Sequence, residues 1–300
     1  MQKLVVILGP TAVGKTNFAV KLAKEFNGEI ISGDSRQVYK GMDIGTGKDL
    51  DEYQIDNSTI PHHLIDILEP NDEYNLFSFQ KDFYSTFNQI ISNNKQPFLV
   101  GGTGLYIHSI LKEYDLHDVD FNSERAKELI LLDESELLEI LKNSKTQFHN
   151  TTDLINKKRI IKAILITEAD NNEIKNKINI EPLVIGITET REIIKERITN
   201  RLKLRLQNGM IDEVENLITS GISYDKLDFF GLEYRFIGSY IKGELSYNDM
   251  YQKLNSAIHK FAKRQMTWFR KMEREGVEIN WLKSDEINEA NLLINHFLDI

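Results

Sequence analysis

The chain has 300 residues, 41% hydrophobic and 28% charged, which suits a globular protein with one large α/β domain carrying an insertion, or with two smaller domains. Its formal net charge of −9 at pH 7 argues against a protein that coats nucleic acid non-specifically, because such proteins are basic. The lack of cysteine excludes disulfides, thiolate nucleophiles and cysteine-ligated zinc, and it predicts a cytoplasmic location.

The first predicted element is a buried strand at residues 4–8, which is too short to span a membrane. The next eight residues fit the phosphate-loop pattern G-x-x-x-x-G-K-[ST]: Gly9, Pro10, Thr11, Ala12, Val13, Gly14, Lys15 and Thr16. In such a loop backbone N–H groups and the lysine bind phosphate, and the hydroxyl of Thr16 can bind magnesium. A predicted helix at residues 17–26 points its positive dipole end at the same phosphates. The loop predicts a phosphate site, but ATPases, GTPases, kinases and other transferases all use it.

Two further predicted strands, at residues 29–32 and 96–100, also end in polar turns. Because the carboxyl ends of parallel strands share one edge of a doubly wound sheet, we expect Asp34 and Thr103 to lie beside the phosphate loop. Asp34 can accept a proton or bind magnesium, and the Thr103 hydroxyl can contact a phosphate oxygen. Asp34 could instead be a helix N-cap, and residues 101–102 a plain turn, but their convergence on the loop favours function. No apolar strand ends in Asp-Glu, so a proton accepted by Asp34 should come from an acceptor substrate rather than from water.

The middle of the chain differs in composition from the rest. Leu, Ile, Glu, Lys and Asn dominate residues 115–180, and their spacing predicts helices. A further strand is predicted at residues 182–188. The predicted fold class is therefore α/β, a P-loop NTPase-like parallel sheet with flanking helices and an all-helical insertion. Residues 1–114 form the first part of the core, 115–180 the insertion, and 181–300 the completion of the core with C-terminal helices.

Two basic segments follow the insertion. Arg197, Arg201 and Arg205 are spaced four residues apart on one face of a predicted helix, a pattern typical of a solvated face with Glu partners. Residues 260–271 interleave lysine and arginine with aromatic side chains, which can stack on bases or pack in the core. We expect packing, with Arg264 as the ligand contact. His62 and His63 lack metal-ligand spacing and are expected to be structural.

Several blocks of the sequence together resemble one family. They are GPTAVGKT at 9–16, DSRQVYKGMDIGT at 34–46, PHHLID at 61–66, GGTGLY at 101–106 and FAKRQMTWFR at 261–270. The chain resembles bacterial tRNA dimethylallyltransferases from about residue 4 to about residue 282. It departs from the family pattern at Val13, Arg36 and Arg205, and at residues 232–233, where Leu-Glu follows a glycine.

The resemblance implies a magnesium-dependent transfer of the dimethylallyl group from dimethylallyl diphosphate to N6 of the adenosine 3′ of the anticodon, with release of diphosphate. It implies that Asp34 is the general base, that Thr103 supports the amine and the diphosphate, and that Arg201 is the catalytic arginine. Residues 9–16 would bind the diphosphate, with Thr16 on Mg2+. The implied partner is the anticodon stem-loop of tRNA, bound by a monomer that flips out the target base. The implied tRNA-binding residues are Asp34, Ser35, Arg36, Gln37, Thr103, Arg125, Lys158, Arg159, Lys162 and Arg264.

Three other functions are compatible with the phosphate loop. A small-molecule kinase would use the loop for ATP, and a related transferase would prenylate free adenine nucleotides. The helical insertion weighs against the second, because a small acceptor needs no extra arm. A phosphate-binding switch or RNA-binding module without catalysis would not need Asp34, Thr103 and Arg201 together.

Overall fold

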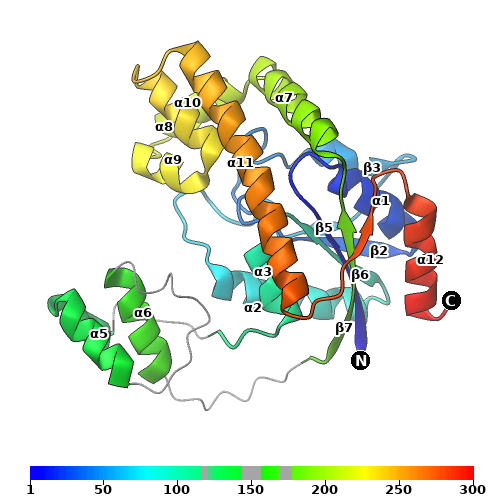
Figure 1. Cartoon of the computed structure of the whole chain (residues 1–300), viewed down its shortest axis with the longest axis horizontal. Helices are drawn as coiled ribbons and strands as arrows, with labels where there is room; N and C mark the ends of the chain where they lie inside the picture. The colour runs from blue at the N-terminus through cyan, green and yellow to red at the C-terminus, as the bar shows by residue number, and fades with distance from the viewer. Residues whose placement is uncertain (117–120, 122, 144–156, 169–177) are drawn as a thin grey trace. The chain divides into compact units, whose positions relative to one another are not determined.

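A computed structural model describes residues 1–116, 121, 123–143, 157–168 and 178–300 (Figure 1). The chain forms two compact units. The first consists of Met1–Glu113 together with Asn179–Ile300, and the second of Tyr114–Ile178. These limits lie within two residues of the boundaries predicted at 115 and 180, and each unit is described by itself.

The first unit is built on a parallel six-stranded sheet with the strand order β5-β2-β6-β1-β7-β8. The strands are β1 Gln2–Leu8, β2 Gly28–Ser32, β5 His62–His63, β6 Gln96–Gly101, β7 Ile180–Ile187 and β8 Asn280–Leu282. A separate antiparallel pair is formed by β3 Gln54–Ile55 and β4 Ser58–Thr59. The central strand β1 pairs with β6 on one side and β7 on the other, so the loop that follows β1 lies at the middle of the carboxyl edge.

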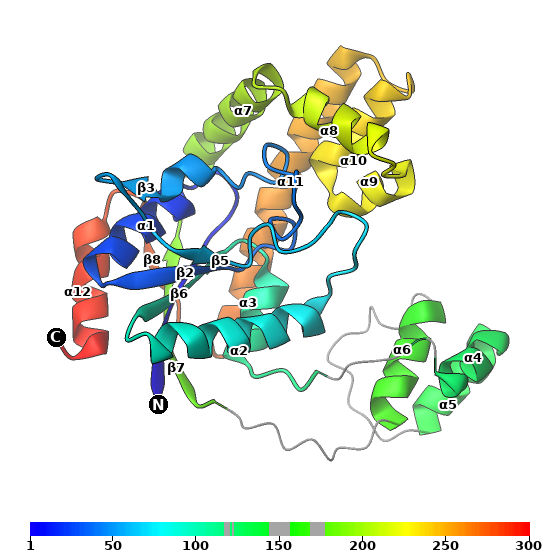
Figure 2. The same cartoon turned by 180° about the vertical axis from the view of Figure 1, so that it is seen from behind.

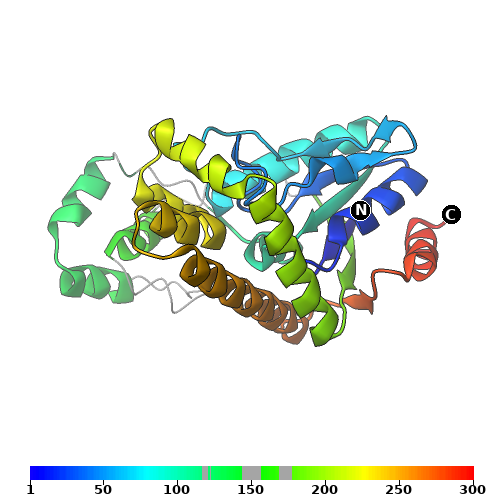
Figure 3. The same cartoon turned by 90° about the horizontal axis from the view of Figure 1, so that it is seen from above.

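Helices cover both faces of the sheet, and further helices pack on one another beside it. The helices of the first unit are α1 Lys15–Glu25, α2 Leu76–Ser92, α3 Gly104–Leu111, α7 Arg191–Gln207, α8 Met210–Thr219, α9 Tyr224–Phe230, α10 Leu232–Ile241, α11 Tyr247–Arg274 and α12 Ile287–Leu298, with a 3-10 turn at Leu50–Tyr53. Figures 1 and 2 show α1 and α12 on one side of the sheet and α2, α3 and α11 on the other. Figure 3 shows α7 beside α11.

The core of the first unit follows the two-residue period of the strands. Val5 and Ile7 of β1 pack in one cluster with Phe18 of α1 and Ile294 of α12, and all four are buried. Because neighbouring residues on a strand point to opposite faces, Val6, also fully buried, faces the other helical layer. A strand that is apolar on both faces needs helices on both sides, which makes this a doubly wound sheet.

In the described part of the second unit, the regular secondary structure is helical. It contains α4 Glu124–Leu131, α5 Glu134–Asn143 and α6 Lys157–Glu168. Leu129, Leu137, Leu141, Ile160 and Ile164 form a small buried core of their own. The predicted α/β class with a parallel sheet is confirmed. None of the helices in the described ranges is long and apolar enough to cross a membrane.

Candidate functional site

The phosphate loop connects β1 to α1 and forms one wall of a cavity of about 910 Å³ in the first unit. Gly14 is the N-cap residue of α1 and has φ 89°, a left-handed conformation that favours glycine, so the first turn of the helix follows directly from the loop. The side chain of Val13 is fully buried, whereas Thr11, Ala12, Gly14, Lys15 and Thr16 line the cavity. The loop therefore presents backbone groups, an ammonium group and a hydroxyl at a helix N-terminus, which suits an anion.

Two cations of the loop region lie close together. The Lys15 ammonium donates to the Pro10 carbonyl at 2.8 Å, and the Arg201 guanidinium on α7 donates to the Thr11 hydroxyl. Burial, and after it the charge of the nearby Arg201, lower the pKa of Lys15 to about 8. Burial, with Arg205 beside it, lowers the pKa of Arg201 to about 10. Two desolvated cations that lie close together suit a multiply charged phosphate.

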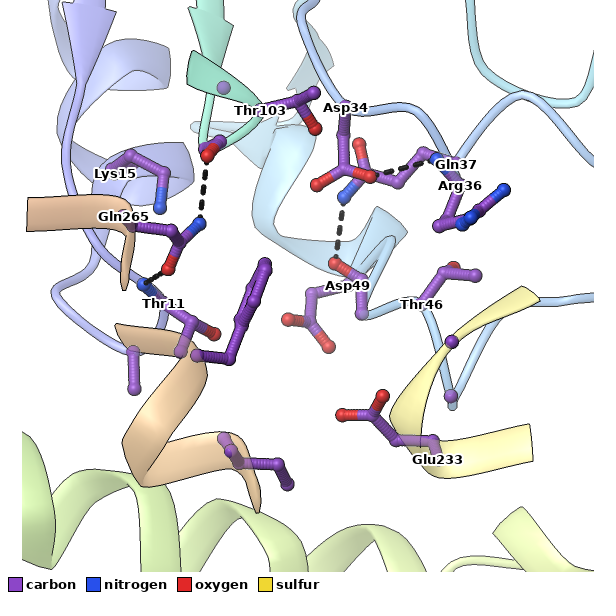
Figure 4. Close-up of a pocket in the computed structure, with 18 of the residues that line it drawn as sticks. Thr11, Lys15, Asp34, Arg36, Gln37, Thr46, Asp49, Thr103, Glu233 and Gln265 are labelled. Carbon is purple, nitrogen blue, oxygen red and sulfur yellow. Dashed lines mark hydrogen bonds between the residues drawn. The ribbon is translucent and has the colours of Figure 1, made fainter. Parts of the chain in front are cut away.

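The predicted catalytic pair Asp34 and Thr103 lies at the same sheet edge. Asp34 follows β2 and accepts the Arg36 backbone N–H at 2.9 Å, while Thr103, after β6, accepts the Ser35 backbone N–H at 3.2 Å. These bonds fix the two side chains relative to each other across adjacent strands. Gln37 donates to the Gly47 carbonyl at 3.0 Å. Figure 4 shows the Asp34 carboxylate pointing into the cavity, so the convergence expected from the strand ends is present.

Helix α11 forms a wall of this cavity, which corrects one prediction. Phe269 packs in the core as expected, but Phe261 is 38% exposed, and Phe261 and Trp268 line the cavity together with Arg264. Residues 261, 264, 265 and 268 share one helical face, and Phe269 lies one turn after Gln265 on the side that packs in the core. A basic and aromatic helix can therefore serve both the core and a ligand site.

Gln265 is a residue that the sequence alone did not single out. Its side-chain oxygen accepts the Thr11 backbone N–H at 2.8 Å, and its side-chain nitrogen donates to the Gly102 carbonyl at 2.8 Å (Figure 4). It thus ties the phosphate loop to the turn that carries Thr103. Its place inside the block 261–270 was the available signal, but a lone glutamine in a basic helix gives no sign of its partners.

The row Arg197, Arg201 and Arg205 is not a uniformly solvated helix face, because all three side chains line the cavity, although Arg197 is 41% exposed. Arg197 donates to the Val13 carbonyl at 3.3 Å and lies 3.6 Å from a Glu189 oxygen. Arg205 donates to both Asp49 oxygens, at 3.2 and 2.9 Å, and its side chain is only 12% exposed. The helical spacing was correctly predicted, but the solvated position expected for Arg205 was wrong. Helix α7 packs along α11, and Arg197 and Arg201 on the same face donate to Val13 and Thr11 of the phosphate loop.

Three carboxylates that were not predicted also reach the cavity: Asp49, Glu52 and Glu233. Burial raises the pKa of Glu52, with Asp49 as the next cause, and burial raises the pKa of Glu233. In Figure 4 the Asp49 and Glu233 side chains point into the cavity from the wall beyond Asp34. A carboxylate repels diphosphate, so this wall suits a ligand that donates hydrogen bonds, such as an amine.

The segment before Asp49 is held by a fourth carboxylate. Glu213 of α8 accepts the backbone N–H groups of Asp43, Ile44 and Gly45 at 2.8, 2.7 and 3.0 Å, and the Tyr234 hydroxyl donates to it at 2.8 Å. Gly45 has no room for a side chain, because an added Cβ would lie 2.7 Å from the Tyr234 ring. We call Glu213 and its hydrogen bonds to the backbone of residues 43–45 the clamp. The clamp sets the position of residues 45–47, which line the cavity.

The other predicted tRNA-binding residues belong to the second unit. Arg125 of α4 forms a salt bridge of 2.7 Å with Glu168 and another of 3.0 Å with Glu128, and these hydrogen bonds raise its pKa. Lys158 of α6 lies 5.4 Å from the centre of the Phe121 ring, and Lys162 lies on the same helix. The side chain of Arg159 is outside the described residues. The predicted roles of these four residues in tRNA binding stay predictions.

The side chains around the loop fit a Mg2+ ion that is bound by substrate phosphate oxygens together with one protein oxygen. Thr16 lines the cavity in the first turn of α1. Within the described part of the chain, no group of three His, Asp or Glu side chains could hold a metal ion by itself. Mg2+ commonly uses one or two protein oxygens together with substrate phosphates, and Thr16 beside the loop matches that set. His63 contacts Glu29 at 2.7 Å, in keeping with its predicted structural role.

Comparison with known proteins agrees with this geometry. A family model described as IPP transferase matches residues 37–272, and one described as isopentenyl transferase matches residues 2–58. The chain is 52% identical over 283 residues to tRNA dimethylallyltransferase 1 of Geotalea uraniireducens strain Rf4, covering 94% of this chain and 93% of that protein.

Solved structures show the same similarity. The crystal structure of full-length tRNA isopentenylpyrophosphate transferase from Bacillus halodurans matches with a TM-score of 0.72 and 32% identity, covering 100% of this chain and 96% of that one. A eukaryotic dimethylallyltransferase acting on tRNA shares the fold, with a TM-score of 0.77 at 22% identity, over 99% of this chain and 78% of that one. One family model spans most of the chain, and one relative is identical to it at about half of the aligned positions. Together with the site at the carboxyl edge of the sheet, these findings show that the chain belongs to the tRNA dimethylallyltransferase family of isopentenyl transferases.

Proposed function

We propose that this protein transfers the dimethylallyl group of dimethylallyl diphosphate to N6 of the adenosine immediately 3′ of the anticodon in tRNA, and releases diphosphate. The observation that carries the proposal is that one cavity holds both an anion site, with Lys15 and Arg201, and a carboxylate, Asp34. A kinase would need the same anion site. The membership of the family favours a prenyl donor over ATP.

The anion site acts on the leaving group. When the allylic C–O bond breaks, its electron pair stays on the diphosphate, whose negative charge increases. Lys15, Arg201 and the loop N–H groups are held in place before the reaction, so they stabilise this charge without further reorganisation. Arg201 is suited to the task because its planar fork remains charged and can bind two phosphate oxygens at once.

The carboxylate acts on the acceptor. A new C–N bond forms between the allylic carbon and N6, and one N6 proton must leave. Asp34 accepts that proton, and Thr103, held beside it through the Ser35 backbone N–H, positions the amine. The aromatic side chains of Phe261 and Trp268 offer apolar surface at the cavity wall for the base and the prenyl chain.

Thr16 is the protein oxygen that would hold Mg2+ beside the diphosphate, and the ion would supply positive charge there. We also propose that one chain is sufficient, because every residue named in this site comes from the first unit of a single chain. The protein would work in the cytoplasm, where its tRNA substrate is found.

The test is incubation of the purified protein with Mg2+, dimethylallyl diphosphate and tRNA that lacks the modification. Mass analysis of the nucleosides should show a five-carbon addition to adenosine at the position 3′ of the anticodon. Asp34→Asn keeps the shape of the side chain but cannot take the proton, so we expect the rate to fall about 10²- to 10⁴-fold. Pyrophosphate binding should stay within about twofold, as in the exposed control Asp51→Asn.

Two outcomes would point to the other functions. Prenyl transfer to AMP or ADP with none to tRNA would identify a free-nucleotide transferase. Phosphate transfer from ATP without any prenyl product would identify a kinase. A protein that binds tRNA and pyrophosphate and has no transfer activity would be a binding module, and Asp34→Asn would then change nothing.

A further inference from the structure

Glu233 is a cavity residue to which the proposed reaction assigns no role. The chain departs from the family pattern at Arg36, at Arg205 and at residues 232–233, three places that are far apart in the sequence. In the structure Arg36, Arg205 and Glu233 all line the reaction cavity. Departures that meet at one ligand site favour a role in ligand binding over a general structural role.

The first turn of α10 holds Glu233 in place. Gly231 precedes the helix with φ 124°, a value that favours glycine. Tyr234 is 1% exposed, and its hydroxyl donates to Glu213 of the clamp at 2.8 Å. Between these fixed neighbours, Glu233 points its carboxyl group into the cavity (Figure 4). The helix dipole favours a carboxylate in a first turn, but that preference does not require the side chain to face a cavity.

The Glu233 carboxyl group is not engaged by the protein. Within the described residues, it forms no salt bridge and no side-chain hydrogen bond with another residue. Arg201 and Arg205 act on its charge, but their guanidinium groups donate to Thr11 and Asp49 instead. Burial raises the pKa of the carboxyl group, so it holds a proton more readily than an exposed glutamate does. Its hydrogen-bonding capacity is therefore available to a ligand.

The surroundings of Glu233 match the acceptor rather than the prenyl donor. A carboxylate repels diphosphate, whose proposed site contains Lys15 and Arg201. Asp34, which takes one N6 proton in the proposed reaction, lines the same cavity and acts electrostatically on Glu233. In adenine the N6 amine donates hydrogen bonds, and the flanking ring nitrogens N1 and N7 accept them. A carboxylate can accept from the amine, and a protonated carboxyl group can also donate to a ring nitrogen.

We propose that Glu233 determines specificity for the acceptor base, by hydrogen bonds from its carboxyl group to the N6 amine and to one adjacent ring nitrogen of the target adenine. Asp34 takes one N6 proton, and the other stays on the nitrogen and is donated to Glu233. Guanine carries an acceptor oxygen in place of this amine, so the same carboxyl oxygen would face another acceptor. This inference rests on the proposed function.

The experiment measures kcat/KM for prenyl transfer to tRNA whose target base is adenosine, 1-deazaadenosine or 7-deazaadenosine. Each analogue keeps the amine and replaces one ring nitrogen by carbon. Glu233→Leu and the smaller Glu233→Ala remove the carboxyl group, whereas Glu233→Gln keeps a donor and an acceptor. The matched control is Glu192→Leu, because Glu192 is an exposed glutamate in the first turn of α7 and lies outside the cavity. Pyrophosphate affinity checks that each variant is folded.

The informative quantity is the ratio of kcat/KM for adenosine to kcat/KM for each analogue, since the intrinsic reactivity of an analogue is the same with every protein. For one analogue we expect this ratio to be about 3- to 10-fold larger in the wild type than in Glu233→Leu and Glu233→Ala, the effect of one hydrogen bond. Glu233→Gln and Glu192→Leu should keep the wild-type ratio.

Equal ratios for both analogues in the wild type and in the two variants without the carboxyl group would show that the inference is wrong. Loss of all transfer in both variants with unchanged pyrophosphate affinity would also overturn it, because Glu233 would then serve the chemical step rather than the choice of base. A wild type that transfers no prenyl group to the tRNA with adenosine would instead contradict the proposed function.

Discussion

At the scale of single residues, Lys15 shows how burial prepares a site for its ligand. Its ammonium group lies beside the Arg201 guanidinium, and its pKa falls to about 8. Between about pH 8 and the ordinary lysine value of 10.5, the unfolded chain holds the proton and the folded chain does not. The free energy of unfolding therefore rises with pH across this window, and the protonated form that phosphate requires is lost in the same window.

This predicts that pyrophosphate binding is coupled to proton uptake. At about pH 9 the free protein holds Lys15 mostly neutral, and the bound anion raises its pKa again, so binding should draw a proton from solution. Calorimetry in buffers of different ionisation enthalpy measures that uptake. Lys15→Arg keeps the charge at all these pH values and accounts for the titration of the ligand itself. Equal proton uptake in the wild type and in Lys15→Arg would show that Lys15 is not the group that takes up the proton.

Gln265 shows why some site residues escape a reading of the sequence. Its two hydrogen bonds, to the Thr11 backbone and to the Gly102 carbonyl, join positions 254 and 163 residues away in the chain. No local pattern encodes such partners. Lys15 and Thr16, in contrast, are recognisable because the phosphate loop places all its groups within eight consecutive residues.

At the scale of elements, the strand ends were predictable and the helix orientations were not. A buried strand followed by a polar turn identifies the carboxyl edge wherever the sheet is parallel, so Asp34 and Thr103 could be placed together before the fold was known. The face of α7 that carries Arg205 became part of the cavity only because α7 packs on α11, a contact between distant segments.

The clamp between α8 and the segment 43–45 leads to a prediction at this scale. Glu213→Ala removes the acceptor of three backbone N–H groups, of which those of Ile44 and Gly45 are part-buried. Because an unpaired buried donor costs about 1–3 kcal/mol, we expect a loss of unfolding free energy of roughly 2 kcal/mol in denaturant titrations, and a faster amide exchange at residues 43–45. Glu215→Gln, on the exposed face of the same helix, should leave both unchanged. Unchanged exchange in Glu213→Ala would show that the clamp does not hold this segment.

At the scale of the whole molecule, the chain has two separate cores and an uneven distribution of charge, and the second feature explains how an acidic protein could bind tRNA. The first unit has its own sheet-centred core, and the second has a small core of Leu and Ile side chains. Charge is distributed unevenly: acidic side chains outnumber basic ones overall, while more cations than carboxylates line the cavity. RNA recognition needs a local basic surface rather than a basic protein.

The division into units predicts the result of removing the second. Replacing residues 115–178 by a flexible Gly/Ser linker should leave the pyrophosphate affinity within about twofold, because the anion site lies wholly in the first unit. If the insertion contacts the anticodon stem-loop as predicted, tRNA affinity should fall by at least about tenfold. Retained tRNA affinity would remove the insertion from the binding surface.

The sequence by itself determined the fold class, the phosphate loop, and the convergence of Asp34 and Thr103, because each of these follows from a local pattern or from the common direction of parallel strands. Only the tertiary structure decided that Gln265 bridges the loop, that Arg205 pairs with Asp49, and that Glu213 holds the segment 43–45. The physical reason is that these contacts join side chains from elements far apart in the chain, whose relative orientation is set by helix packing rather than by any sequence period.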